Sequence, residues 1–139
     1  MRPLLLPLLV LPLLAGCNSE PYGVAPVSGR ITLNGKPLAK ASVTFAPVAA
    51  GGNQEPGPSS AGTTDSDGRY VLRLIGTDRR GAVVGKHKVR VALTDEANTA
   101  EDKPSRLKQL PLKYNGQTTL EFEVPANGSD QANYDLTDP

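Results

Sequence analysis

Two apolar-alternating segments separated by an Asn-Gly pair decide the fold of this chain: Val27-Ser-Gly-Arg-Ile-Thr-Leu33, then Asn34-Gly35, then Ala41-Ser-Val-Thr-Phe-Ala-Pro47. Hydrophobic residues occupy alternate positions in both flanking segments, which is the pattern of a strand with one buried face. Asn and Gly both tolerate positive φ, and together they are the strongest short signal for a hairpin turn. The stretch therefore predicts two strands and an intervening turn at Asn34 and Gly35.

The same alternation recurs through the rest of the chain. It predicts five further strands, over 61–64, 69–74, 86–93, 118–124 and 130–136. We find no amphipathic helical pattern, and alternation with one polar face is typical of antiparallel sheets. Seven short strands predict an all-β fold, a seven-stranded antiparallel β-sandwich. Phe45 and Phe122 are its largest purely hydrophobic side chains, and we expect both near the centre of the core.

The segment Asp65-Ser66-Asp67-Gly68 lies between the predicted strands 61–64 and 69–74. We interpret it as a hairpin turn in which the Asp65 side chain accepts local N–H groups and Gly68 takes positive φ. An EF-hand counted from Asp65 would need Gly at its sixth position and Glu at its twelfth, where Tyr70 and Gly76 stand. Weak calcium capture by Asp65 and Asp67 is the alternative, and no metal site is predicted.

The N-terminus has the features of an export signal. Arg2 precedes an uncharged, Leu-rich run that ends in Leu14-Ala15-Gly16-Cys17. A positive start, a short apolar run and small residues before a cut are typical of a secretory signal peptide. Leu-Ala-Gly-Cys also resembles the bacterial lipobox. That resemblance implies attachment of diacylglycerol to the Cys17 thiol, then cleavage between Gly16 and Cys17, and then acylation of the new amino group by a fatty acid such as palmitate.

These features predict a simple organisation. The signal peptide covers 1–16, the lipidated Cys17 and a flexible tether cover 17–26, and one domain covers 27–139. Nine tether residues would span at most about 30 Å. Without Arg2 the formal net charge is zero, which argues against a nucleic-acid partner. Cys17 is the only cysteine, so there is no disulfide framework.

Catalytic residues are not evident. His87 is the only histidine, and its place two residues before Val89 puts it on the inward side of a strand, as a packing residue. One histidine without a second cysteine is not a zinc ligand set. No nucleophile elbow supports a serine triad, although triads assemble in space. We expect neither catalysis nor a cofactor.

The ordered motifs Val27–Leu38, Ala41–Phe45, Gly62–Tyr70 and Gly85–Val89 resemble the carboxypeptidase regulatory-like domain. Leu110-Pro-Leu-Lys-Tyr114 resembles a segment of small bacterial surface lipoproteins built from one such domain. The resemblance covers about residues 27–136. It implies a transthyretin-like (prealbumin-like) β-sandwich without peptidase activity of its own.

The sequence therefore predicts a non-catalytic, lipid-anchored protein of the cell envelope, facing the periplasm or the cell surface. Its expected contact with the membrane is the anchor at Cys17. We expect a structural or protein-interaction module with an envelope protein as partner. The alternative is a ligand-binding module for glycan or peptide that uses the loops 48–60 and 94–110, because binding sites gather on loops of rigid scaffolds.

Overall fold

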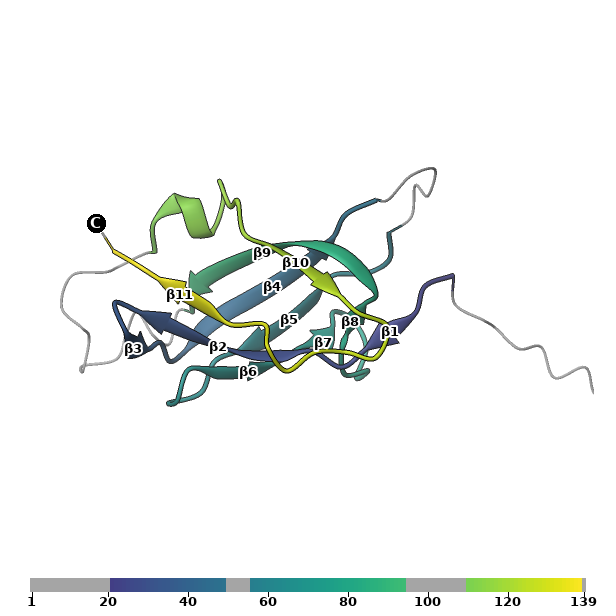
Figure 1. Ribbon diagram of the computed structural model, residues 1–139, viewed down its shortest axis with the longest axis horizontal. Coiled ribbons are helices and arrows are strands. Elements are labelled where there is room, and N and C mark those ends of the chain that lie inside the picture. The colour runs from purple at the N-terminus through teal and green to yellow at the C-terminus, as the bar shows by residue number, and fades with distance from the viewer. Residues whose placement is uncertain (1–20, 50–55, 95–109, 139) are drawn as a thin grey trace, which may run out of the picture.

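The computed structural model describes residues 21–49, 56–94 and 110–138. The described chain is nearly all β, with a sandwich-like arrangement of two main sheets (Figure 1). It holds eleven strand segments, several of them only two residues long, and one short 3-10 helix. The all-β class predicted from alternation is confirmed.

The larger sheet has five strands in the order β10-β9-β4-β5-β7. Their bounds are Glu121–Val124, Gly85–Leu93, Ala41–Pro47, Ser60–Thr63 and Arg73–Leu74. Every pair in this sheet is antiparallel. The long central strands alternate strictly, so that His87, Val89 and Val91 are buried while the residues between them are exposed.

The second sheet is built around β2, Ser28–Leu33. Its partners are β3 (Lys36–Pro37), β6 (Arg69–Val71) and β11 (Tyr134–Leu136). β11 runs parallel to β2, so the expectation of a purely antiparallel sandwich is wrong for this pair. The chain reaches β11 through the turn after β10, which crosses from one sheet to the other and brings β11 in beside β2 in the same direction (Figure 1).

The predicted strand 69–74 serves both sheets. Its first half is β6, paired with β2, and its second half is β7, paired with β5. Leu72 lies between them, fully buried, and donates its N–H to the Val27 carbonyl at 3.0 Å. This division is one reason why the number of segments exceeds the seven predicted. The other is the short pairs such as β3.

The chain enters the fold earlier than the predicted tether allows. β1, Val24–Ala25, pairs with β8, Ala82–Val83, and Ala25 is buried. The expected flexible tether over 17–26 is therefore wrong for its last residues, because Ala25 fills a core position that alternation alone did not reveal. Residues 17–20 lie outside the described part of the chain.

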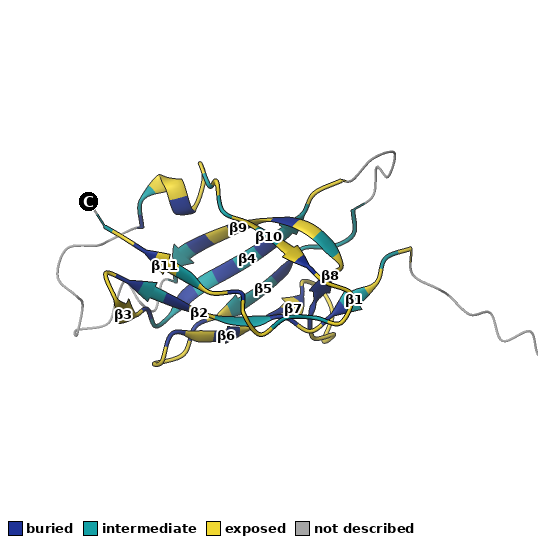
Figure 2. Ribbon diagram, in the orientation of Figure 1, coloured by how far each residue is buried: buried dark blue, intermediate teal, exposed yellow. Residues whose placement is uncertain are grey.

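The core lies between the two sheets (Figure 2). Phe45 is fully buried at its centre, as predicted, with its ring 5.6 Å from that of Phe122. Phe122 is only partly buried, so its predicted central place is wrong: β10 is an edge strand of its sheet. A 3-10 helix, Leu112–Tyr114, closes one end with Leu110 and Tyr114 buried.

Candidate functional site

The hairpin residues singled out in the sequence form tight turns. Asn34 and Gly35 have φ of 52° and 81°, the paired positive angles that Asn-Gly favours. In the second turn Asp65 accepts the N–H groups of Asp67 and Arg69 through Oδ1, at 2.9 and 3.0 Å, and Gly68 has φ of 74°. These contacts use the Asp65 carboxylate within the turn itself.

His87 is fully buried and stacks at a tilt on Phe45, with ring centroids 5.6 Å apart. Its Nε2 lies 2.6 Å from the Val83 carbonyl oxygen, while Nδ1 has no hydrogen-bond partner. Burial lowers the pKa of His87, and the carbonyls of Val83 and Phe45 oppose that shift. Because the Val83 carbonyl oxygen can only accept a hydrogen bond, the neutral ring carries its proton on Nε2. This hydrogen bond fixes the orientation of the ring, which packs as part of the core.

Several predicted features lie wholly or partly outside the described residues. The predicted cleavage and lipidation residues, Gly16 and Cys17, are outside them. So are residues 50–55 of the candidate binding loop 48–60 and residues 95–109 of the candidate binding loop 94–110. Across the described part of the chain, no helix has the length and apolarity to cross a membrane. No group of three metal-ligating side chains gathers there either.

A concentration of like charge with a defined geometry lies on the outer face of the second sheet. β2 and β6 pair so that Arg30 stands directly opposite Arg69, and both side chains are exposed. Directly opposed residues on one face of an antiparallel pair have Cβ atoms about 5 Å apart, and like charges there repel. This pair is therefore an unfavourable arrangement for the isolated domain.

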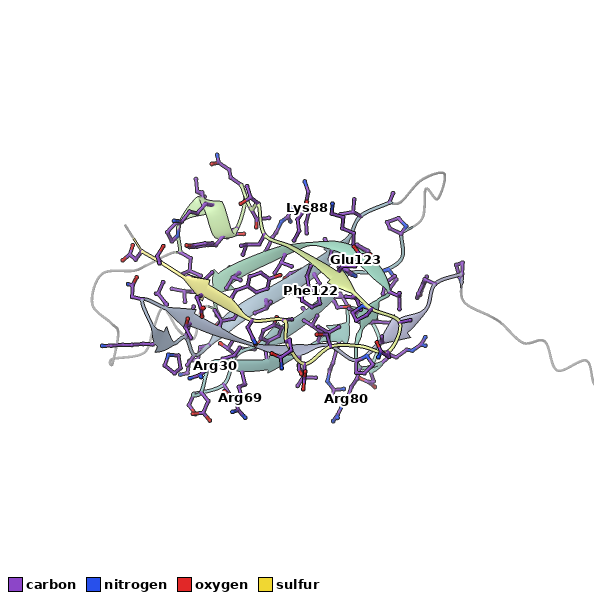
Figure 3. The ribbon with its side chains drawn as sticks, in the orientation of Figure 1. Arg30, Arg69, Arg80, Lys88, Phe122 and Glu123 are labelled. Carbon is purple, nitrogen blue, oxygen red and sulfur yellow. The ribbon has the colours of Figure 1, made fainter. Side chains whose placement is uncertain are left out.

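A second pair of arginines repeats the arrangement farther along the same chain. Arg73 and Arg80 face each other in an isolated antiparallel bridge. Arg69, Val71 and Arg73 alternate with buried residues, so they project to the same outer side. Figure 3 shows Arg30, Arg69 and Arg80 along one side of the molecule, away from Lys88 on the other sheet.

Two adjacent depressions follow this line of arginines, with volumes of about 430 and 400 Å³. We call them together the arginine groove. Its lining includes Ser28, Arg30, Arg69, Val71, Arg80 and Asp130. The far wall is the segment 127–133, which hydrogen-bonds to β2 through Ser129 and Ala132. The side chain of Asn133 joins this wall to β2 by accepting the Arg30 N–H at 2.9 Å.

The arginines of the groove are not neutralised by their neighbours. Within the described ranges, none of Arg30, Arg69 and Arg80 forms an ion pair, in contrast to Lys86, which lies 3.4 Å from Glu121 on the other sheet. Arg30 Nε donates to the Asp67 carbonyl at 3.0 Å, which leaves its terminal nitrogens for another acceptor. The carboxylate of Asp130 accepts the Gln131 amide instead.

The groove has the chemistry of a site for carboxylates. A guanidinium offers a planar fork of N–H donors that matches two carboxylate oxygens. Val71 is exposed and lines both depressions, the one with Arg69 and the one with Arg80. It adds a small apolar contact to the groove. Tyr70 is the one aromatic residue in the lining, but it is buried and its hydroxyl donates to the Ala132 carbonyl at 2.6 Å. It offers no free ring face on which a sugar could stack.

Sequence reasoning missed this groove, although each strand pattern correctly places Arg30 and Arg69 on polar faces. The missing information was the register, since the two residues lie 39 positions apart and meet only when β6 pairs with β2.

A search of this chain against protein-family models, curated proteins and solved structures found no match.

Proposed function

We propose that this chain is a non-catalytic, lipid-anchored envelope protein whose domain binds a carboxylate-rich segment of a partner protein in the arginine groove. In this proposal the signal peptide is removed before Cys17 and the mature protein is held at the membrane by its lipid. The domain belongs to the transthyretin-like, carboxypeptidase regulatory-like type that its motifs resemble.

The observation that carries the binding proposal is the opposed Arg30–Arg69 pair without a carboxylate partner among the described residues. Like charges directly across a sheet destabilise it, typically by about 0.2–1 kcal/mol. A bound carboxylate would bridge the two guanidinium groups and remove this repulsion. Arg80 supplies a further positive charge along the groove, which suits an extended ligand with several acidic groups.

An acidic peptide fits the groove better than a glycan does. Carbohydrate sites rely on exposed aromatic rings, and the ring of Tyr70 is covered. The outer walls offer donors and a valine instead, which suit carboxylate side chains and a peptide backbone. This favours the protein-interaction function over the glycan-binding alternative.

The binding test uses the mature chain with Cys17→Ser, so that it stays in solution. We expect titration with hexaglutamate to show binding that weakens in high salt. Arg69→Glu should weaken it by about tenfold or more, because a charge-assisted hydrogen bond contributes about 1.5–3 kcal/mol. The matched control is Arg90→Glu, the same charge change on an exposed position of β9.

Equal loss in the two variants would show a general charge effect and would reject the groove. Tighter binding of an oligogalacturonate than of hexaglutamate would reject the peptide in favour of an acidic glycan. Inorganic phosphate serves as a third probe, and binding as strong as that of hexaglutamate would reject selectivity for carboxylates.

The anchor has a separate test in cells. The chain with its natural Cys17 should fractionate with membranes and incorporate labelled fatty acid, whereas the Cys17→Ser variant should do neither. Membrane association retained by Cys17→Ser, with label still incorporated, would reject lipidation at this residue.

A further inference from the structure

We propose that the domain stands on the membrane with one defined end, which we call the β1–β8 end, in contact with the lipid surface. This end is formed by Tyr22, Val48, Pro56 and Val84, beside β1 and β8. The inference rests on the proposed lipid anchor at Cys17.

Only a short length of chain separates the proposed anchor from the fold. The Gly23 carbonyl accepts the Val84 N–H at 2.9 Å, and β1 follows at once. The Tyr22 ring lies over Gly57, where an added Cβ would be 3.1 Å from it. The fold therefore holds the chain from Tyr22 onward. Five residue steps from Cys17 to Tyr22 span at most about 18 Å in any conformation, not the roughly 30 Å of the expected tether.

This length restricts which part of the domain can meet the bilayer. β9 alone has nine residues, which correspond to a length of about 30 Å. It starts at Gly85, beside the β1–β8 end, and runs toward the opposite end, where the β2–β3 hairpin lies (Figure 1). An anchor attached within about 18 Å of one end keeps that end near the lipid.

The side chains of the β1–β8 end also suit contact with lipid. Val48 and Val84 are 37% and 36% exposed, and with Tyr22 and Pro56 they line one depression, in which Lys86 is the one charged residue among those that the structure describes. The outer faces of the two sheets instead carry charged side chains, among them Arg69 on β6 and Lys88 on β9. Apolar and tyrosine side chains favour the boundary between headgroups and acyl chains, whereas exposed charges favour water. Val71, Ile75 and Leu112 are more exposed, but the β1–β8 end combines its apolar side chains with the point where the chain from Cys17 enters the fold.

This orientation keeps the arginine groove accessible. The groove runs along the flank of the molecule that carries Arg30, Arg69 and Arg80 (Figure 3). With the β1–β8 end on the membrane, the part of the groove lined by Arg80 borders β1 and β8, whereas the part lined by Arg30 and Arg69 faces sideways. A partner anchored in the same membrane or free in solution can reach this second part.

The test uses the mature lipidated protein in phosphatidylcholine–phosphatidylethanolamine vesicles that carry a lipid-borne fluorescence quencher. A fluorophore is attached through Val84→Cys or through Lys36→Cys in β3, since the lipidated thiol of Cys17 does not react. We expect quenching several-fold stronger at position 84 than at position 36. Equal quenching, or stronger quenching at position 36, would overturn the orientation.

A second variant tests the apolar contact. In the Val84→Cys background, Val48→Asp should lower the quenching several-fold, whereas Leu112→Asp, at an exposed apolar position in the 3-10 helix, should not change it. Quenching unaffected by Val48→Asp would overturn the lipid contact. Failure of the anchor itself gives a different result, because the protein then does not co-sediment with the vesicles.

Discussion

At Gly68 the backbone takes a conformation, and leaves a space, that only glycine fits. Its φ is 74°, and a Cβ built there would lie 2.3 Å from the Ile31 carbonyl oxygen. Gly76 has a similar φ of 84°, but a Cβ there would meet nothing within 4 Å. We expect Gly76→Ala to cost about 1 kcal/mol of unfolding free energy, for the positive φ alone. Gly68→Ala should cost at least twice as much, because the β2–β6 pairing must also move apart. Urea unfolding of both variants measures this, and equal losses would contradict the crowding at Gly68.

His87 links stability to pH at the same scale. Burial lowers its pKa in the folded state, so the unfolded chain takes up a proton first as the pH falls below about 6.5. Stability should therefore decline from pH 7 toward pH 5.5, with a slope of at most about 1.4 kcal/mol per pH unit. His87→Leu removes this titration and should flatten the slope, whatever its effect on stability at pH 7. Denaturant unfolding at several pH values tests it, and parallel slopes for the two proteins would refute the assignment to His87.

At the scale of elements, central and edge strands should respond differently to the loss of an aromatic ring. Phe45 lies on β4, in the middle of the five-stranded sheet, and is fully buried, whereas Phe122 lies on the edge strand β10 and is partly exposed. Phe45→Ala should cost about 3–5 kcal/mol. Phe122→Ala should cost roughly half of that, since less apolar surface leaves water on folding. Thermal and chemical unfolding compare the two, and a larger loss at Phe122 would place the centre of the core elsewhere.

The edge at β10 also has a specific link to the other sheet. The Tyr134 hydroxyl on β11 donates to the Glu121 carbonyl at 2.9 Å, and burial raises the pKa of Tyr134 to about 12. This bond joins edge strands of the two sheets. On the other side, the chain itself joins them as it passes through Leu72 from β6 to β7. The two sheets are therefore connected on both sides of the core.

For the whole molecule, the arginine groove predicts opposite effects on stability and on binding. Arg69→Glu turns the repulsive pair with Arg30 into an attractive one, so the free energy of unfolding should rise by about 0.2–1 kcal/mol while binding of hexaglutamate falls. Arg69→Gln removes the charge without reversing it, so its free energy of unfolding should lie between those of the unsubstituted protein and Arg69→Glu. Denaturation of the ligand-free proteins checks this, and destabilisation by Arg69→Glu would show that the pair is not strained.

The sequence by itself determined the alternating strands β2, β4 and β9, their buried faces and two turns. Alternation has a period of two residues and is local, so it is legible within single segments such as 41–47 and 86–93. The Asn34-Gly35 turn is equally local, because it depends on the conformations that two adjacent residues tolerate. The proposed anchor at Cys17 likewise rests on a contiguous motif.

Only the tertiary structure decided which strands became partners. Alternation places Arg30 and Arg69 on outer faces, but it does not give the register between their strands. If β6 paired with a strand other than β2, the two arginines would lie apart. The parallel pairing of β11 with β2, the division of 69–74 between two sheets and the burial of Ala25 have the same origin. Each depends on contacts between residues far apart in the chain, and those contacts are chosen by how the whole core packs.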